Sequence, residues 1–181
     1  MEFPIVANDL CVRPFAEGDA AAFVSAVHES VATVGAWMPW CRLQYTAQDA
    51  RSWFEQSLAA LRAGTAYDVG IFSADGALLL GGVGINQLNL QHNFGNIGYW
   101  VRESQQRRGV ATRAVRIMAA HGFDRLKLTR LEIVAAVENR ASRGVAAKVG
   151  AVFECIARNR LVVNERPMAA AVYSLTPHAG G

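Results

Sequence analysis

One short stretch near the middle of the chain holds the residues whose types and spacing are best suited to chemistry. An apolar run at 97–101 leads into a polar turn ending in Gly109, and an amphipathic run follows at 112–123. A strand that turns through glycine into a helix presents backbone N–H groups, unpaired within the helix, at the positive end of the helix dipole. Such a corner binds phosphate or pyrophosphate. The alternative is an ordinary turn with solvated side chains. The donors that this turn adds are Gln106, Arg107 and Arg108.

The spacing in this turn differs from the two commonest nucleotide-binding loops. No Gly-Lys-Ser/Thr closes it, as in a Walker loop, and the dinucleotide fingerprint GxGxxG is missing. Its pattern, Gln106-x-x-Gly109-x-Ala111, resembles the Q/R-x-x-G-x-G/A pyrophosphate loop of the GNAT acetyltransferases, which bind acetyl-coenzyme A. The position of the pattern between an apolar strand and an amphipathic helix strengthens the resemblance.

A second, separate motif resembles the same family. This motif lies at residues 139–150. In the RimJ/RimL branch of ribosomal-protein N-terminal acetyltransferases it reads roughly N-x-x-S-x-x-x-x-x-K-x-G-F, and Ala151 stands where that branch usually has Phe. The aromatic loop at 37–40 is similar to the tryptophan-proline-tryptophan loop of that branch. The resemblance covers about residues 10–175. Its two separate motifs both imply the same cofactor. The matching positions of the second motif are Asn139, Ser142, Lys148 and Gly150.

The resemblance implies acetyl-CoA as the cofactor and gives roles to particular residues. The backbone at 99–101 would pair with pantetheine like an added strand, and residues 106–111 would wrap the pyrophosphate. Asn139 would bind the pantetheine arm and Ser142 would lie near the thioester sulfur, although helix capping explains both equally well. Arg143 or Lys148 would meet the 3′-phosphate, unless each is merely solvated. The expected cofactor-binding residues are Tyr99, Trp100, Val101, Gln106, Arg107, Arg108, Gly109, Val110, Ala111, Thr112, Asn139 and Ser142.

Acetyl transfer to an amine sets further chemical requirements. The amine must lose a proton, since lysine and α-amines are mostly protonated at neutral pH. The oxyanion that develops on the acetyl group needs a hydrogen-bond donor. We expect a backbone N–H on the central strand near Val101 to be this donor. The leaving thiolate departs more easily with a proton from a hydroxyl such as that of Ser142. Direct transfer without an acyl-enzyme is what the resemblance implies.

The proton acceptor is the least defined part of the site. Many relatives carry Glu immediately before the Ile-Gly-Tyr of the central strand, but this chain has Asn96, and an amide takes no proton at neutral pH. His92 in the preceding turn titrates near neutrality, and Glu138 could act through water. Simple solvation accounts for either side chain, and solvent could itself deprotonate an α-amine.

Four residues are candidates for contact with the acceptor. Trp37 and Trp40 would form an apolar rim, or pack in the core instead. Gln87 and Asn89 lie two apart on an expected strand, so they should share a face. They could contact the acceptor or be ordinary surface residues.

The elements that must position these residues follow from periodicity. Helices are expected at about 20–30, 46–62, 112–123 and 143–149, with Asp19 and Thr46 as caps. Trp53, Phe54, Leu58 and Leu61 are expected to form the buried stripe of the second helix. Strands are expected at 10–14, 67–72, 77–90, around 97–101, and at 131–137, 152–157 and 168–175. The fold class is α/β in the mixed α+β sense, and the resemblance implies a mostly antiparallel, splayed GNAT sheet flanked by helices. We expect a single acetyltransferase domain at 1–178 and a loose tail at 179–181.

Composition bounds the remaining classes. The chain has 181 residues, 52% of them hydrophobic and 18% charged, which is typical of a globular domain. The net charge of +3 and the lack of a long basic stripe argue against nucleic-acid binding. No apolar run is long enough to span a membrane, so we expect a cytoplasmic protein. The odd number of cysteines, without metal spacing, favours free thiols and no metal site; they are Cys11, Cys41 and Cys155.

The sequence thus predicts an acetyl-CoA-dependent N-acetyltransferase acting on a small amine or a protein N-terminal α-amine, and a homodimer is compatible with the resemblance. A non-catalytic acyl-CoA-binding protein is the alternative, because Asn96 could reflect a lost base. Nothing in the residues identifies the acceptor.

Overall fold

The helices of this chain lie where the periodicity predicts them, except at the start of the last. The structure is a computed structural model that describes residues 3–7 and 9–177, so the expected tail at 179–181 lies outside the described residues. Its α-helices are α1 (Ala20–Glu29), α2 (Ala47–Ala63), α3 (Val110–Asp124) and α4 (Arg140–Lys148), and a short 3-10 turn, η2 (Glu103–Gln105), precedes α3. The last helix begins at Arg140 rather than at 143, because the Asn139 side chain caps it by accepting from the Ser142 N–H.

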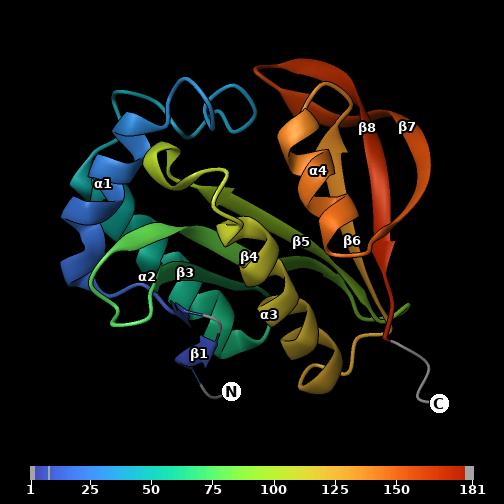
Figure 1. Cartoon of the computed structure of the whole chain (residues 1–181), viewed down its shortest axis with the longest axis horizontal. Coiled ribbons are helices and arrows are strands. Elements are labelled where there is room, and N and C mark those ends of the chain that lie inside the picture. Colours follow the sequence, from blue (N-terminus) through green and yellow to red (C-terminus); the bar gives the residue numbers. More distant parts are fainter. Residues whose placement is uncertain (1–2, 8, 178–181) are drawn as a thin grey trace.

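The strands form one mixed, mostly antiparallel sheet within the described residues. They are β1 (Ile5–Ala7), β2 (Leu10–Arg13), β3 (Tyr67–Ser73), β4 (Leu79–Asn89), β5 (Phe94–Val101), β6 (Arg130–Ala136), β7 (Val152–Val163) and β8 (Arg166–Leu175). Their spatial order is β1-β2-β3-β4-β5-β6-β8-β7 (Figure 1). The sequence did not predict β1, and β7 is longer than expected.

The pairing of β5 with β6 is the one parallel contact among the described strands, and it is short. Residues 94–96 of β5 pair with residues 130–132 of β6. Beyond them β6 continues its pairing with β8, and β5 continues with β4. The sheet therefore splays between β5 and β6. The edge of β5 at 97–101 is left without a strand beside it on that side.

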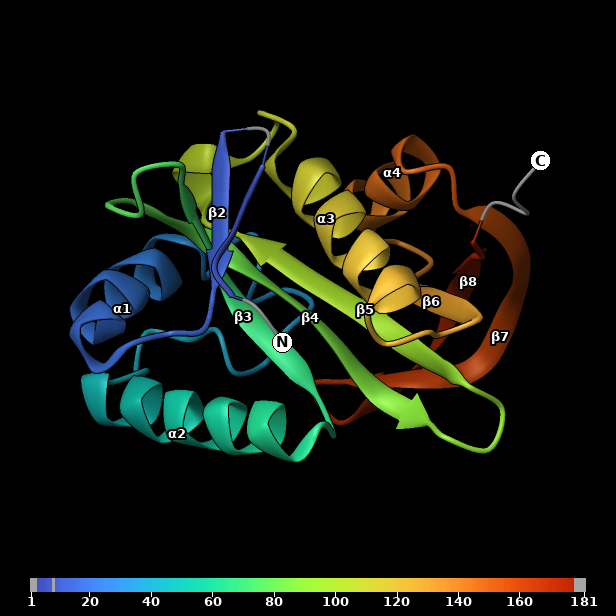
Figure 2. The same cartoon turned by 90° about the horizontal axis from the view of Figure 1, so that it is seen from below.

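The two faces of the sheet carry separate cores. On one face, α3 packs with Ile97, Met118 and Leu131 in a continuous apolar cluster. On the other, α1 and α2 pack with Phe23, Phe72 and neighbouring residues. Figure 2 shows α3 and the pair α1 and α2 on opposite sides of the strands. The sheet beside the wedge between β5 and β6 is thus packed on both faces.

The ends of α2 match the sequence prediction, and its buried face matches that prediction in part. Thr46 forms a capping box with Asp49, and Gly64 ends the helix at φ +69°. Trp53 was expected in the buried stripe, but it is 38% exposed, and the buried residues of α2 are Ala50, Phe54 and Ser57. Phe54 is buried as predicted, and the small residues Ala50 and Ser57 complete the buried face.

Two smaller expectations have clear outcomes. Asp19 does not cap α1 through its side chain, because its carboxylate accepts from Arg13 at 2.7 and 3.0 Å and from the Ala16 N–H. The thiols of Cys11, Cys41 and Cys155 are free, as predicted. Among the described helices, none is both long and apolar enough to cross a membrane.

Candidate functional site

A cavity of about 860 Å³ lies where β5 diverges from β6. Its walls come from four parts of the chain: residues 32–38, the end of β5 at 99–101, the turn and first residues of α3 at 105–112, and residues 139–148 around α4. These segments are far apart in sequence. The short parallel pairing described above brings them together.

The first turn of α3 meets the cavity without a capping side chain. Gly109 precedes the helix at φ +74°, and the first helical bond joins the Arg113 N–H to the Gly109 carbonyl at 3.1 Å. Within the described residues, the N–H groups of Val110, Ala111 and Thr112 make no hydrogen bond. Amides at a helix start are an anion-binding arrangement. The residues present therefore fit a diphosphate.

The Gln106 side chain fastens this turn to the rest of the site. Its amide nitrogen donates to the Val101 carbonyl at 3.0 Å and to the Thr33 hydroxyl at 3.1 Å. Thr33 belongs to the segment that forms the opposite wall of the cavity. Because the amide nitrogen is used within the protein, Gln106 holds the turn in shape, whatever else its exposed atoms bind.

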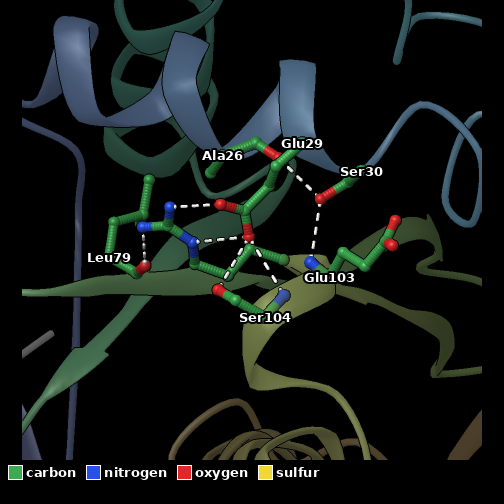
Figure 3. Close-up of polar contacts among 7 residues, drawn as sticks. Ala26, Glu29, Ser30, Leu79, Glu103 and Ser104 are labelled. Atoms are coloured by element: carbon green, nitrogen blue, oxygen red, sulfur yellow. Dashed lines mark hydrogen bonds and ion pairs between the residues drawn. The ribbon is translucent and has the colours of Figure 1, made fainter.

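The end of α1 is fastened to the same turn through Glu29. One carboxylate oxygen accepts from Arg102 Nε at 2.9 Å and from the Ser104 N–H and hydroxyl at 3.1 and 2.9 Å, and the other accepts from Arg102 Nη2 at 2.6 Å. The Ser30 hydroxyl accepts from the Glu103 N–H at 3.0 Å. Figure 3 shows Glu29 pointing toward Ser104, with Ser30 beside Glu103. The Arg102 guanidinium lowers the pKa of Glu29 to about 2, so this carboxylate is ionised at neutral pH.

Two hydroxyl groups meet on the other wall of the cavity. Tyr99 Oη lies 2.9 Å from the Ser142 carbonyl oxygen, to which it can donate, and 3.0 Å from Ser142 Oγ. Burial raises the pKa of Tyr99 to about 12, so its hydroxyl keeps its proton at neutral pH. Asn139 accepts from the Ser142 N–H at 3.0 Å, which fixes the start of α4. Capping is therefore one role of Asn139, and its amide nitrogen remains available to a ligand.

The predicted cofactor-binding residues collect around this cavity with one exception. Arg108 is not part of the lining, and the others all are. Arg113, in the first turn of α3, is directed elsewhere, because it donates to the Arg108 carbonyl and pairs with Asp9 at 3.2 Å. Arg143 donates to the Tyr173 hydroxyl and the Val137 carbonyl. Lys148 lines the cavity.

The four predicted acceptor residues do not come together. Trp37 lines the cavity, whereas Trp40 packs against Trp100 with ring centroids 5.4 Å apart in the core under α1. A bulge between Asn86 and Asn89, with Gln87 at φ +50°, breaks the alternation that was expected to place Gln87 and Asn89 on one face. Asn89 instead accepts from the His92 N–H in the β4–β5 turn.

Neither candidate base lines the cavity. His92 is exposed at the start of the hairpin, so about seven residues of strand, or roughly 23 Å, separate it from Tyr99. Glu138 is exposed beside α4. Asn96 donates to Asn86 Oδ1 at 3.1 Å on the face of the sheet that α1 and α2 cover.

Several lining residues escaped the sequence analysis. Those at 32–36 carry no motif, and their role depends on hydrogen bonds to a turn some seventy residues later. Arg140 was passed over because the helix was expected to start later. The capping signal of Asn139 was the one feature of the sequence from which a helix start at Arg140 could have been predicted.

Comparisons with known proteins find a matching family model and several relatives. The family model described as "Acetyltransferase (GNAT) domain" matches residues 9–152. YdaF of Bacillus subtilis (strain 168), provisionally named a ribosomal N-acetyltransferase, is 27% identical over 177 residues, covering 94% of this chain and 92% of YdaF. A Vibrio cholerae structure, provisionally described as a ribosomal-protein-serine acetyltransferase, is 30% identical with a TM-score of 0.84 and covers 97% of this chain and 98% of its own. Mycobacterium smegmatis RimJ, solved in complex with CoA-disulfide, is 26% identical with a TM-score of 0.84 and covers 93% of this chain and 82% of its own.

Proposed function

Because the chain belongs to the GNAT acetyltransferase family, we propose that it uses acetyl-CoA to acetylate a primary amine, and that the amine is the N-terminal α-amine of a peptide or protein. The observation that carries the proposal is the uncapped start of α3 beside the Tyr99–Ser142 pair in one cavity. The names of the relatives, which refer to ribosomal-protein acetylation, support a protein N-terminus over a small amine.

The residues around the cavity suggest a division of roles. Acetyl-CoA would supply the activated acetyl group. The free amides at 110–112 would hold its diphosphate, and the open edge of β5 at 97–101 would hold its pantetheine arm by strand-like hydrogen bonds. Lys148, which lines the cavity, would attract its 3′-phosphate.

Ser142 would give a proton to the leaving sulfur. Its hydroxyl contacts Tyr99, whose own hydroxyl remains protonated and can return a proton to Ser142 Oγ. A backbone N–H on β5 near Val101 would stabilise the developing oxyanion. Each role belongs to an atom that lies along the cavity.

The proposal is tested by binding and turnover measured on the same protein. Calorimetry with acetyl-CoA is expected to show one site per chain. Thiol release is then followed with peptides beginning in serine or alanine, and with an N-acetylated peptide whose one amine is a lysine. Release with the free-N-terminus peptides alone supports the proposal. Release with the lysine peptide alone would reassign the acceptor.

A second candidate is an acyl-CoA-binding protein without turnover, which the amide at Asn96 favours because the family resemblance implies a carboxylate there. Tight acetyl-CoA binding without thiol release for any amine would support this second function.

A further inference from the structure

A carboxylate lies on the face of the sheet opposite to α3, one strand away from β5. Asp68 of β3 stands opposite Gly84 of β4, and Gly84 stands opposite Gly98 of β5. A Cβ atom built on Gly84 would overlap the Asp68 carboxylate, so this carboxylate lies over Gly84 and extends toward β5. Because adjacent strands are about 4.8 Å apart, the space over Gly98 is within reach of the carboxylate, directly or through one water.

Two amides connect this carboxylate to the position before the Ile-Gly-Tyr of β5. Asn86 Nδ2 donates to Asp68 Oδ1 at 3.1 Å, and Asn96 Nδ2 donates to Asn86 Oδ1 at 3.1 Å. The carboxylate only accepts, so it dictates the orientation of Asn86, which in turn dictates that of Asn96. The Asn96 carbonyl oxygen is left facing away from the chain of amides as an acceptor.

Asp68 differs from three other hydrogen-bonded carboxylates of this protein. Asp19, Glu29 and Glu154 each pair with an arginine. Within the described residues, Asp68 forms no salt bridge, and burial raises its pKa while the Asn86 hydrogen bond opposes part of that rise. A partly buried carboxylate without a cation is unfavourable, so its site is suited to a cation from outside the chain.

The space next to Asp68 can receive such a cation. A Cβ atom on Gly98 would meet only Asn96 Nδ2, at 3.9 Å, which leaves room over this glycine. Gly98 precedes Tyr99, which lines the cavity, and the edge of β5 there has no strand beside it. The two faces of the sheet therefore meet at this edge. An amine over Gly98 could approach an acetyl group held along β5.

We propose that Asp68 binds the ammonium group of the acceptor over Gly98 and accepts its proton, in place of the carboxylate missing at Asn96. This inference rests on the proposed acetyltransferase function. Asp68 would act on the amine itself, directly or through one water, while Asn86 and Asn96 are positioning residues that orient the carboxylate and the amine.

The proton balance of the step is complete. The ammonium gives one proton to the Asp68 carboxylate, which later releases it to solvent. The nitrogen lone pair then forms the bond to the acetyl carbon as the carbon–sulfur bond breaks. The second proton lost by nitrogen replaces the one that Ser142 gives to the sulfur. One amide, one free thiol and one solvent proton result.

The test compares Asp68→Asn with the wild-type protein and with Asp124→Asn, the same change at an exposed position at the end of α3. The probe is a hexapeptide with an N-terminal serine, and thiol release and acetyl-CoA affinity are both measured. We expect Asp68→Asn to lower turnover about 100-fold at pH 7, with acetyl-CoA affinity within about twofold of the wild type and of Asp124→Asn.

The pH profile separates proton acceptance from a structural role. The residues that face Asp68 from α2 and from the segment after β2 are all non-ionisable: Pro14, Phe15, Phe54, Ser57, Leu58 and Leu61. A peptide α-amine has a pKa of about 8, so it is mostly neutral by about pH 9. The deficit of Asp68→Asn should therefore shrink as pH rises to 9. Adding Asn96→Glu to Asp68→Asn restores a carboxylate beside Gly98 and should recover part of the turnover.

Each result supports or overturns the inference. Turnover of Asp68→Asn equal to that of Asp124→Asn, or a deficit equal at pH 7 and pH 9, overturns it. If the wild type binds acetyl-CoA but releases no thiol, the proposed function fails, and carboxyl ¹³C NMR decides the inference instead. The Asp68 resonance, assigned by its loss in Asp68→Asn, should then shift when the peptide is added to the CoA complex. An unmoved resonance contradicts the inference.

Discussion

Two hydroxyl groups meet in the cavity with different acidities and different neighbours. The Tyr99 side chain extends from β5 to α4, where its hydroxyl contacts Ser142. Burial raises the pKa of Tyr99 to about 12, so its hydroxyl stays protonated throughout the neutral range. Ser142 has a hydroxyl that can exchange a proton with Tyr99 and, in the proposed mechanism, with the sulfur of acetyl-CoA. The pair can pass a proton without either oxygen being charged at rest.

Replacing Ser142 by alanine should therefore affect turnover more than binding. We expect Ser142→Ala to lower the turnover number about 100-fold, because the thiolate then leaves without a proton, and to leave the acetyl-CoA dissociation constant within about threefold. Tyr99→Phe should have a smaller effect on turnover, since Ser142 still contacts the sulfur. Steady-state thiol release and calorimetry measure both quantities, with Ser25→Ala on the exposed side of α1 as control. Equal turnover of Ser142→Ala and wild type would leave Ser142 a structural residue.

Gly109 offers a second test at the level of one residue. Its φ of +74° disfavours any side chain, and a Cβ there would lie 3.0 Å from Arg113 Nη1, at the point where the free amides begin. Gly109→Val should raise the acetyl-CoA dissociation constant at least about tenfold, because the amides at 110–112 lose their arrangement. It should also destabilise the fold by about 2 kcal/mol through backbone strain.

Gly76 supplies the matched control for Gly109. It has φ +75° in the β3–β4 turn, with nothing within 4 Å of an added Cβ. Gly76→Val should lower the free energy of unfolding by a similar amount and leave acetyl-CoA affinity unchanged. Chemical denaturation and calorimetry of both variants separate the two effects. An unchanged affinity in Gly109→Val would remove the diphosphate from this turn.

At the scale of elements, the contact between α1 and η2 decides where the turn before α3 lies, the turn that we propose binds the diphosphate. Glu29 joins the last turn of α1 to Arg102 and Ser104, which stand just before α3. Its folded-state pKa of about 2 is below the ordinary glutamate value of 4.5. The stabilisation by a carboxylate with a lowered pKa is fully present above the unfolded value and is lost as pH falls through the folded value.

Glu29→Gln should accordingly cost about 2 kcal/mol of unfolding free energy at pH 7, the usual size for charge-assisted hydrogen bonds with a partly buried partner. The difference from wild type should narrow between about pH 4.5 and pH 2, where the wild-type carboxylate becomes protonated. Acetyl-CoA affinity should also fall several-fold, since the turn loses an anchor. Urea denaturation at several pH values measures the stability, with the exposed Glu55→Gln on α2 as control. A pH-independent difference would show that the carboxylate charge is not what stabilises the contact.

The elements also show how far local patterns reach. Thr46 begins α2 as predicted, because capping depends on neighbours in sequence. The bulge that moves Gln87 off its expected face depends on pairing with β5, which periodicity within β4 does not encode. Glu29 could not be foreseen as a partner of Arg102, since 73 residues separate them and no motif links them.

At the scale of the whole molecule, the resemblance to a family supplied what periodicity could not. The runs of apolar residues predict strands, but they say nothing of how long β5 and β6 stay paired. The splay follows from that length, since pairing stops after residues 94–96. The carboxylate at Asp68 was likewise missed, because it reaches the site through two neighbouring strands and carries no motif of its own.

The splay makes a prediction that involves both halves of the sheet. A ligand in the wedge contacts β5, α3 and α4 together, so it should stabilise the folded state by about 2.7 kcal/mol at a hundred times its dissociation constant. For a chain of this size that corresponds to a rise in melting temperature of about 5–10 °C.

Slower hydrogen exchange should be confined largely to the amides of β5 at 97–101 and of α3 at 110–112, which lack a strand or helical partner on the cavity side. Exchange measured by mass spectrometry with and without acetyl-CoA locates the protection. Protection on β2 and β3, with none at 97–101 or 110–112, would place the ligand outside the wedge. Gly76→Val should reproduce the wild-type pattern, whereas Gly109→Val should lose the protection at 110–112 first.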